Sequence, residues 1–527
     1  MRRNPPMSDS TYRGTTPRPA DFDAFWDARM AEADAVPLCY AVEPSEIPAY
    51  PTCEYLNLWF TGMGGARIYA KYLRPKSDKP LPLVLQFHGY PGASRSWLEQ
   101  SSFAGMGYAL LAMDCPGQGG KSQDIGGFLG TTVSGHLIVG LDGEPKDMYY
   151  VRLYQNIRIL CRIVRQMKDI DQRRIYINGA SQGAGLGIAC AALNPDLPCK
   201  AAILYPFLSD FQKVFELGAD EIAYEGLRYY ARWFDPDGSR ANEWFTKLGY
   251  VDAVHLASRI RCEVLFGTGL ADVVCPPITQ DAVYNNLTCK KRREFFPGFG
   301  HEEIQAFDDM LLTFFDDAPV VPCPVSTPTA EYQTVTFVAD DGATLSARYI
   351  RPVGNKRVPT VLMFHDAGRP VRGWHHMTRF VALGYAVFAL ENRAEADAQT
   401  QFADAQAAAR AALSLPTTLN LIAWGEGLGG TLAIAAAAKQ PQHVVKCAAQ
   451  NPLCTGAYAD CAQYAAQLVC PLLMGTSGMD TIAPPDAQNV VYDAASCDKK
   501  RYIYVKYIHE RINAFEDRVL AFFHPMV

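Results

Sequence analysis

The sequence predicts an α/β protein made of two tandem copies of one fold, each built around a mainly parallel sheet. Three observations support this prediction. Short apolar runs bounded by glycine-rich turns alternate with helical patterns, which is typical of βαβ units. The same order of segments occurs twice along the chain. The length of 527 residues also exceeds what one hydrophobic core usually serves.

The two copies align segment by segment. The early stretch IYAKYLRPKSDKPLPLVLQFHGYPG matches LSARYIRPVGNKRVPTVLMFHDAG, which places His365 opposite His88, 277 residues later (365 − 88). GASQGAGLGIACAALNP then aligns with GEGLGGTLAIAAAAKQP at an offset of 246, and the final segments, which contain His301 and His509, align at 208 (509 − 301). Each match covers a predicted strand and the turn or helix that follows it.

The alignment sets the expected domain limits. We predict a first domain over residues 1–317 and a second over 330–527. The stretch between them, 318–329, reads APVVPCPVSTPT, and its prolines and small residues favour an extended linker.

The offset between matching segments falls along the chain, from 277 to 246 and then to 208, and each fall shows where the second copy is shorter. It lacks 31 residues (277 − 246) and then a further 38 (246 − 208), which in the first copy correspond to 126–150 and to the aromatic-rich segment 207–250. Both excursions follow the carboxyl ends of predicted strands, the side on which an open α/β sheet places its ligands. We expect them to cover a site, with Tyr224, Trp233 and Trp244 as candidate substrate-binding residues of the lid.

Composition excludes several classes of function. The net charge of −6 is spread without long single-sign runs, which argues against a nucleic-acid partner. No apolar run approaches the length of a membrane span, and no secretory signal is recognisable. The 15 cysteines are scattered without a CxxC pair, which favours reduced thiols and a cytoplasmic protein. The histidines form no metal-binding pattern either, so no metal is expected.

The chemistry is expected in the first copy, at Gly179-Ala180-Ser181-Gln182-Gly183. This G-x-S-x-G follows a strand pattern and precedes a helical one, as does the nucleophile elbow of the α/β-hydrolase fold. Glycines flank the serine because a side chain two residues away would collide with the neighbouring strand or helix. Ser181 is therefore the predicted nucleophile, and the alternative is a serine that merely caps the helix.

A serine hydroxyl needs a base, and this fold orders the triad as serine, acid, histidine. Asp272 follows the strand pattern EVLFG, and His301 follows the next strand. We predict that His301 is the general base and that Asp272 orients it. Asp252 is the rival acid, but it precedes the strand, so a structural role is favoured for it.

Acyl transfer also needs donors for the developing oxyanion. In this fold one donor is the backbone N–H that follows the nucleophile, here that of Gln182. The second comes from a loop after an early strand, and HGYPG makes the N–H of Tyr90 the candidate.

These motifs resemble the family-seven carbohydrate esterases, the acetyl xylan esterase and cephalosporin C deacetylase group. The resemblance covers nearly all of the first copy, from PRPADFDAFWD through FHGYPG, DCPGQG, GASQGAG and ADVVCPP to FGHE. It implies a triad of Ser181, Asp272 and His301 with an oxyanion hole from Tyr90 and Gln182. It also implies removal of acetyl groups from short acetylated sugars, without a cofactor, by an intracellular homo-oligomer.

The sequence departs from this family in two respects. The family's Arg-Gly-Gln is Pro116-Gly117-Gln118 here, so the loop must be held without that arginine. The family also usually ends near the close of the first copy, so the appended copy could replace or block its oligomer contacts.

The second copy keeps the glycines of the elbow without the nucleophile. Ser181 corresponds to Gly427 (181 + 246), whereas the acid and base positions survive as Asp480 and His509. Glu426 is a carboxylate in the same turn, but it occupies the wrong position for a nucleophile. We interpret this copy as a degenerate hydrolase fold kept for packing, for dimerisation or for shaping the entrance of the first site.

Three hypotheses about function follow. The first is a serine esterase acting on small acetylated carbohydrates such as xylo-oligosaccharides, or on cephalosporin C-like acetates. The second is a broader carboxylesterase or a peptidase on the same fold, because a triad does not specify its acyl group. The third is a non-catalytic scaffold or binding protein in which both copies are degenerate.

Overall fold

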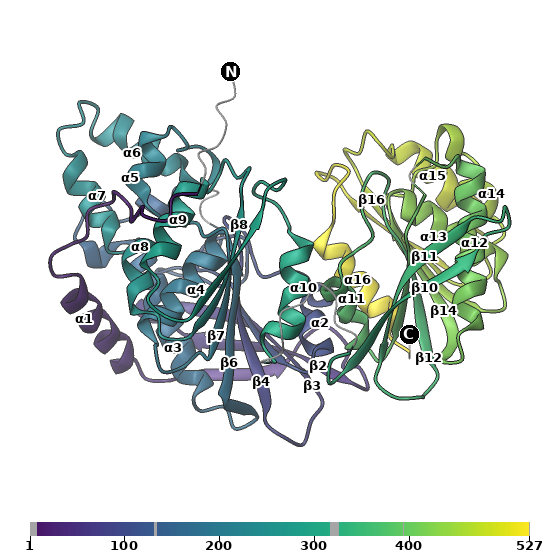
Figure 1. Ribbon diagram of the computed structural model, residues 1–527, viewed down its shortest axis with the longest axis horizontal. Coiled ribbons are helices and arrows are strands. Elements are labelled where there is room, and N and C mark those ends of the chain that lie inside the picture. Colours follow the sequence, from purple (N-terminus) through teal and green to yellow (C-terminus); the bar gives the residue numbers. More distant parts are fainter. Residues whose placement is uncertain (1–7, 131–133, 317–325, 394, 526–527) are drawn as a thin grey trace. The chain divides into compact units, whose positions relative to one another are not determined.

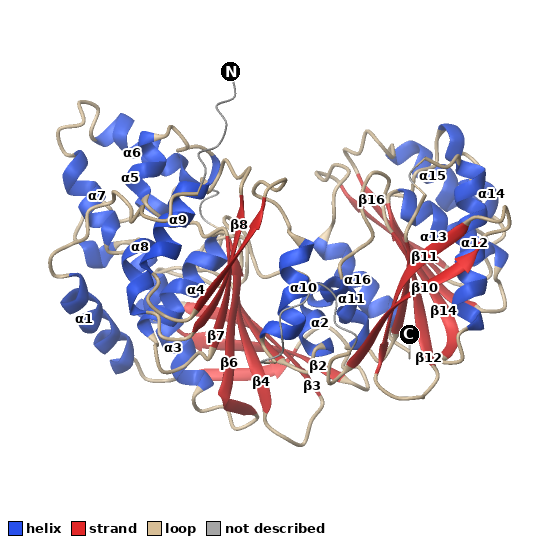
Figure 2. Ribbon diagram, viewed as in Figure 1, coloured by secondary structure: helices blue, strands red, loops and turns tan. Residues whose placement is uncertain are grey.

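The computed structural model describes residues 8–130, 134–316, 326–393 and 395–525 (Figure 1). Contacts within the chain divide it into two compact units. The first unit comprises 1–45, 55–94 and 108–307, and the second comprises 46–54, 95–107 and 308–527. Each unit contains one sheet flanked by helices (Figure 2).

The first sheet has nine strands in the order β1-β2-β3-β5-β4-β6-β7-β8-β9. Strands β4 to β9 pair in parallel, whereas β1, β2 and β3 extend the sheet at its antiparallel edge. The strands are β1 (Tyr40–Pro44), β2 (Cys53–Thr61), β3 (Arg67–Pro75), β4 (Leu81–Phe87), β5 (Ala109–Met113), β6 (Ile170–Ala180), β7 (Lys200–Leu204), β8 (Glu263–Gly269) and β9 (Lys291–Phe296).

Helices cover this sheet and build the excursions. The short central strands β5 and β7 are buried along their whole length, as expected of strands with helices on both faces. The helices are α1 (Phe22–Ala35), α3 (Tyr149–Val164), α4 (Gln182–Leu193), α5 (Phe211–Glu216), α6 (Glu225–Phe234), α7 (Ala241–Gly249), α8 (Ala253–Leu256) and α9 (Pro277–Asn286), and the following helix, α10 (Gln305–Phe314), begins in this unit but has residues 308–314 in the second. Of these, α5, α6 and α7 form the lid excursion.

The second sheet has eight strands in the order β10-β11-β13-β12-β14-β15-β16-β17, the order of the first sheet without β1. These strands are β10 (Ala330–Val338), β11 (Thr344–Pro352), β12 (Val358–Phe364), β13 (Ala386–Leu390), β14 (Thr418–Glu426), β15 (Val444–Gln450), β16 (Leu472–Ser477) and β17 (Lys499–Tyr504). The helices of this unit are α2 (Trp97–Gly105), α11 (Trp374–Val381), α12 (Ala398–Ser414), α13 (Leu428–Lys439), α14 (Cys461–Ala465), α15 (Pro485–Ala494) and α16 (Asn513–Phe523).

The predicted α/β architecture with two sheets is confirmed by this shared strand order. In the second unit, α12 and α13 lie on one face of the sheet, with α11 and α16 on the other (Figure 2). The connection from β13 to α12 is seven residues long (391–397), whereas 35 residues (114–148) join β5 to α3 in the first unit. The sheet and its helices are thus repeated without the first excursion.

The contact-defined units differ from the predicted domain ranges at one helix in particular. Helix α2 belongs to the first copy in sequence but packs with the second unit, against α11 and α16. A Cβ on Gly105 would lie 2.0 Å from the carbonyl oxygen of Thr378, so α2 and α11 approach closely there. The limits 1–317 and 330–527 remain a prediction, and the predicted linker lies mostly outside the described residues.

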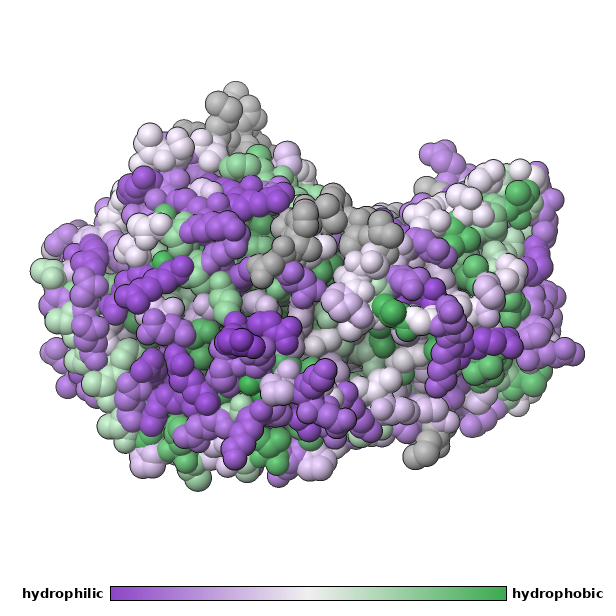
Figure 3. Space-filling view, turned by 60° about the horizontal axis from the view of Figure 1, so that its bottom comes forward, coloured by the Kyte–Doolittle hydropathy of each residue, from purple (hydrophilic) through white to green (hydrophobic). Residues whose placement is uncertain are grey.

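None of the helices described by the structure is both long and apolar enough to cross a membrane. On the face shown in Figure 3, hydrophilic residues are intermixed with small hydrophobic areas. The cysteines described by the structure are free, and most of them are buried.

Candidate active site

Ser181 stands in a strained turn between β6 and α4. Its backbone angles are φ 57° and ψ −123°, a region that side-chain-bearing residues rarely adopt. A Cβ on Gly179 would lie 2.2 Å from the carbonyl oxygen of Gly183, and one on Gly183 would lie 2.0 Å from that of Phe87. The two glycines are therefore required by backbone contacts, as the motif predicted.

The structure brings Ser181, His301 and Asp272 together. His301 Nε2 lies 2.9 Å from Ser181 Oγ, and His301 Nδ1 lies 2.9 Å from Asp272 Oδ2. Ser181 and Asp272 are buried, and His301 is half-buried. The hydroxyl, the imidazole and the carboxylate thus form one chain of hydrogen bonds in the order that acyl transfer needs.

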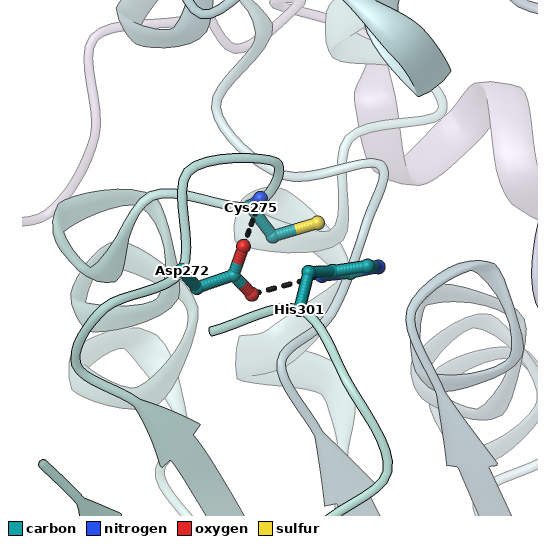
Figure 4. Close-up of side chains that lie close together, drawn as sticks. All are labelled: Asp272, Cys275 and His301. Atoms are coloured by element: carbon teal, nitrogen blue, oxygen red, sulfur yellow. Dashed lines mark hydrogen bonds and ion pairs between the residues drawn. The ribbon is translucent and has the colours of Figure 1, made fainter. Parts of the chain in front are cut away.

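Asp272 is held rigidly by the loop that follows β8. Its Oδ1 accepts the backbone N–H groups of Val274 at 2.9 Å and of Cys275 at 2.8 Å. These bonds leave Oδ2 directed at the imidazole of His301 (Figure 4). A carboxylate fixed in this way can hold one tautomer of the histidine and stabilise its protonated form.

Cys275 lies beside these two residues, so that a carboxylate, a thiol and an imidazole come within 4.8 Å of one another (Figure 4). Burial raises the pKa of the Cys275 thiol well above its ordinary value. A thiol must lose its proton to bind a metal. Asp272 and His301 also use their facing atoms on each other, so the group fits an acid–base pair better than a metal site.

Asp252, the rival acid, has a structural role in this geometry. Its carboxylate caps α8 by accepting the N–H of Val254 at 2.8 Å and also accepts that of Asp210 at 3.0 Å. Burial, followed by the nearby Asp210 carboxylate, raises the pKa of Asp252 to about 7. It joins the lid to the body of the unit.

The two predicted oxyanion donors lie at the ends of the expected elements. Tyr90 follows β4, and Gln182 is the first residue of α4. The Tyr90 hydroxyl lies 3.0 Å from His136 Nδ1, and its ring stacks on Phe207 at a centroid distance of 5.7 Å. Because His136 belongs to the first excursion and Phe207 begins the second, both excursions hold the loop that carries the Tyr90 N–H.

A buried polar network behind the elbow was missed by sequence reasoning. Gln182 Oε1 accepts from Gln118 Nε2 and from the Tyr150 hydroxyl, each at 2.9 Å, and the Tyr149 hydroxyl donates to the Pro116 carbonyl at 2.7 Å. These bonds fix the Pro-Gly-Gln loop in which the family's arginine is absent. The Gln in DCPGQG was the available signal, but its partners come from a helix distant in sequence.

Tyr205 is a second residue that the sequence did not single out. Its ring centroid lies 4.7 Å from that of His301, and its hydroxyl donates to the carbonyl of Glu302 at 2.7 Å. Tyr205 follows β7 directly and has a φ of 34°. It packs against the imidazole and ties down the loop that carries it.

The three candidate lid residues have different environments. Trp244 is 1% exposed and donates its indole N–H to Asp235 at 3.0 Å, and Tyr224 has no exposed surface. Contrary to the expectation, these two side chains pack the interior of the lid, since a side chain without exposed surface presents nothing to a ligand. Trp233 is 64% exposed.

Trp233 lines a cavity of about 970 Å³ between the two excursions. Its lining includes His136 and Asp142 from the first excursion and Tyr229 from the lid. The triad residues are not among the lining residues, so the hydrogen-bonded triad rather than the volume of a cavity locates the chemistry.

The second copy has the same elbow backbone without a nucleophile. Gly427 has φ 56° and ψ −123°, within one degree of Ser181. Glu426 is tied to Arg372 by an ion pair of 2.7 Å. Although burial raises its pKa, the charges of Arg372 and a neighbouring arginine leave the pKa of Glu426 below its ordinary value. Glu426 is therefore bound in an ion pair and does not face an open site.

Comparisons with known proteins agree with this architecture. The family model for acetyl xylan esterase (AXE1) matches residues 7–319 and then, in two further pieces, 317–407 and 448–525. The unmatched stretch between the last two pieces contains the elbow that lacks its serine. The matches thus cover both copies of the fold.

Three relatives illustrate the similarity. The acetyl esterase Axe7A of Xylanibacter ruminicola is 28% identical over 307 residues, 55% of this chain, and the chain spans only 65% of that relative's length. The crystal structure of acetyl xylan esterase 1 from Thermoanaerobacterium sp. JW/SL YS485 is 41% identical, with a TM-score of 0.56 over 58% of this chain and 96% of that one. The acetyl xylan esterase of Paenibacillus sp. R4 is 29% identical, with a TM-score of 0.56 over 60% of this chain and all of that one.

The family model covers well over half of the residues, and the geometry around Ser181 is that of the fold's nucleophile elbow. The chain therefore belongs to the acetyl xylan esterase family.

Proposed function

We propose that the first copy is a serine esterase that removes acetyl groups from small acetylated carbohydrates, with cephalosporin C-like acetates as a further substrate class. The observation that carries this proposal is the chain of hydrogen bonds from Ser181 through His301 to Asp272 at a strained elbow. Relatives of the same family, named as acetyl or acetyl xylan esterases, support the acetyl group as the one removed.

The proposed reaction has two steps. In the first, His301 Nε2 takes the proton of the Ser181 hydroxyl while Oγ attacks the acetyl carbonyl carbon. The oxyanion that forms accepts the N–H groups of Tyr90 and Gln182, and its collapse expels the sugar alcohol, which receives the proton from His301. In the second, water attacks the acetyl-serine with His301 again as base, which releases acetate and restores Ser181.

We infer that the second copy does not take part in this chemistry. It carries glycine where the nucleophile would stand, and the neighbouring carboxylate Glu426 is held by Arg372. It is a degenerate hydrolase copy in this proposal. The scattered free cysteines support a cytoplasmic location, and a homo-oligomer is kept as an expectation from the family.

Hydrolysis of an ester series tests the proposed function. We expect turnover of 4-nitrophenyl acetate and of acetylated xylo-oligosaccharides, with kcat/KM falling steeply from acetate through butyrate to octanoate. We expect this limit on acyl length because both excursions contact Tyr90, through His136 and Phe207, next to the site of the reaction. Activity that rises with acyl length would favour the broader carboxylesterase, cleavage of peptide amides would favour a peptidase, and no turnover at all would favour the scaffold.

Trp233 is the lid residue best placed to contact a sugar, because it is exposed and lines the cavity between the excursions. We expect Trp233→Ala to raise KM for acetylated xylo-oligosaccharides by about 5- to 30-fold, which corresponds to about 1–2 kcal/mol of lost contact, with kcat nearly unchanged. The matched measurement uses 4-nitrophenyl acetate, which carries no sugar for Trp233 to contact. An equal rise in KM for both substrates would contradict a sugar-contacting role.

A further inference from the structure

The second copy retains the anion-binding parts of a serine hydrolase site. The correspondence between the copies places the N–H of Leu428 where the first copy has that of Gln182 (182 + 246), and the N–H of Ala367 where it has that of Tyr90 (90 + 277). His509 Nδ1 lies 2.7 Å from Asp480 Oδ2, as His301 does from Asp272. Two backbone donors and an imidazole therefore converge on a place that has no nucleophile.

The side chain of Asp366 occupies that place. Its Oδ1 accepts the N–H of Ala367 at 2.8 Å and that of Leu428 at 2.8 Å. Its Oδ2 lies 3.0 Å from His509 Nε2, the atom whose counterpart in the first copy faces Ser181. The residue opposite Asp366 in the first copy is Gly89 (366 − 277), so only the second copy can fill its site in this way.

Asp366 also explains the missing serine. A Cβ on Gly427 would lie 1.9 Å from Asp366 Oδ1 and 2.2 Å from its Cγ. A serine at position 427 and the carboxylate of Asp366 thus exclude each other in this arrangement. The glycine of GEGLGG is required here by the aspartate and not only by the packing of strand against helix.

The charges of the site suit a bound carboxylate. The hydrogen bond to Asp366, together with Asp480, raises the pKa of His509 although burial opposes this. Burial raises the pKa of Asp366, but the bonds from His509, Leu428 and Ala367 outweigh it and leave that pKa below its ordinary value. Both ring nitrogens of His509 face carboxylate oxygens, so the imidazolium form can donate a hydrogen bond to each of them.

Little space is left around the bound side chain. The remaining cavity is about 10 Å³, too small for an acetyl ester. The other charged residues on its lining are two arginines, Arg369 and Arg511, and two glutamates, Glu426 and Glu510. The groups that hydrogen-bond to the Asp366 side chain are the N–H groups of Ala367 and Leu428 and the imidazole of His509, and such groups bind carboxylates through charge-assisted hydrogen bonds.

We propose that the vestigial site of the second copy is a carboxylate-binding site whose resident ligand is the side chain of Asp366. Removal of that side chain opens the site to small free carboxylates such as acetate. The inference goes beyond the proposed esterase, because it concerns a site that has no nucleophile and does not depend on turnover in the first copy.

Chemical rescue by acetate tests this site. In sodium chloride, Asp366→Gly in the full chain is expected to lower the Tm of the second unit by about 5–10 °C, because it leaves His509 and the N–H groups of Ala367 and Leu428 without their carboxylate partner. Sodium acetate at the same ionic strength is expected to restore several degrees in a concentration-dependent way, since a ligand that binds only the folded state raises its Tm. Glycine is the residue that the first copy carries at this position.

Two controls make the result specific. The wild-type chain has the same first site as the variant. A change in the Tm of the wild type in acetate is therefore caused by acetate at that first site or by a general effect of the salt. Asp366→Asn keeps an oxygen in the hole and should respond to acetate much less than Asp366→Gly. An acetate shift in Asp366→Gly no larger than in the wild type would overturn the proposal, as would an unchanged Tm of Asp366→Gly in chloride.

The pKa of His509 provides a test that requires no destabilised variant. In the wild-type chain with ¹⁵N-labelled histidine, the signal lost in His509→Gln should titrate above the ordinary value of 6.5. The stabilisation from this group is fully present below about pH 6.5 and is lost as the pH rises through the folded pKa, whereas that from Asp366 is lost only as the pH falls through a value below 3.8. A His509 that titrates at or below 6.5 would contradict an imidazolium bound to Asp366.

Discussion

Ser181→Ala is expected to lower kcat for 4-nitrophenyl acetate by roughly 10⁴- to 10⁶-fold. The hydroxyl is placed to attack the acyl carbon, because its Oγ lies 2.9 Å from His301 Nε2 at the tip of the elbow. The change removes one oxygen and fills no space, so the fold of the first unit should remain. Turnover, Tm and covalent labelling by a fluorophosphonate probe are the measurements.

A serine elsewhere on the same unit serves as the control for Ser181. Ser258 is exposed and donates only a long hydrogen bond of 3.4 Å to the carbonyl of His255. Ser258→Ala should therefore retain kcat within about twofold, in keeping with the small effects of surface substitutions. Labelling or turnover that survives Ser181→Ala at an unchanged Tm would show that another residue is the nucleophile.

Asp272→Asn is expected to lower kcat by about 10²- to 10⁴-fold with little change in KM, because the loss falls on the transition state. Asparagine retains an oxygen that can accept the N–H groups of Val274 and Cys275, so the loop should keep its shape. The side facing His301 then carries an amide, which cannot stabilise the imidazolium and favours the wrong tautomer.

The matched variant is Asp252→Asn, which tests the rival acid. Asp252 bonds to the backbone of Val254 and Asp210, and burial raises its pKa to about 7. A neutral amide therefore resembles a form that this residue already adopts near pH 7, and kcat should fall by no more than about twofold. If Asp252→Asn caused the larger loss, the assignment of the acid would be wrong.

The local parts of the first site were predictable from sequence. Ser181 is identified by glycines two residues to either side, and the contacts of Gly179 and Gly183 show why only glycine fits. Asp272 and His301 each follow a strand, and parallel strands bring their carboxyl ends to one edge. The motif and the strand topology were together sufficient to predict that these three residues lie close together, because neither depends on how a particular side chain packs.

The environment of the lid side chains was not predictable in the same way. Trp233 and Trp244 lie eleven residues apart in one aromatic-rich segment, yet one is 64% exposed and the other 1%. The difference arises because the indole N–H of Trp244 donates a hydrogen bond to the carboxylate of Asp235 inside the lid. Composition identified the excursion, but packing decided which ring faces a cavity.

The sequence by itself determined that the chain carries two copies of one fold, that one copy holds a serine, an aspartate and a histidine in the order of a hydrolase, and that the other lacks the serine. Only the tertiary structure decided what replaces the serine. Asp366 bonds to Leu428 and His509, which lie 62 and 143 residues further along the chain. A local sequence pattern cannot predict contacts between residues so far apart in the sequence. Folding brings the N–H of Leu428 and the imidazole of His509 to the carboxylate of Asp366, which the sequence HDAG alone does not reveal.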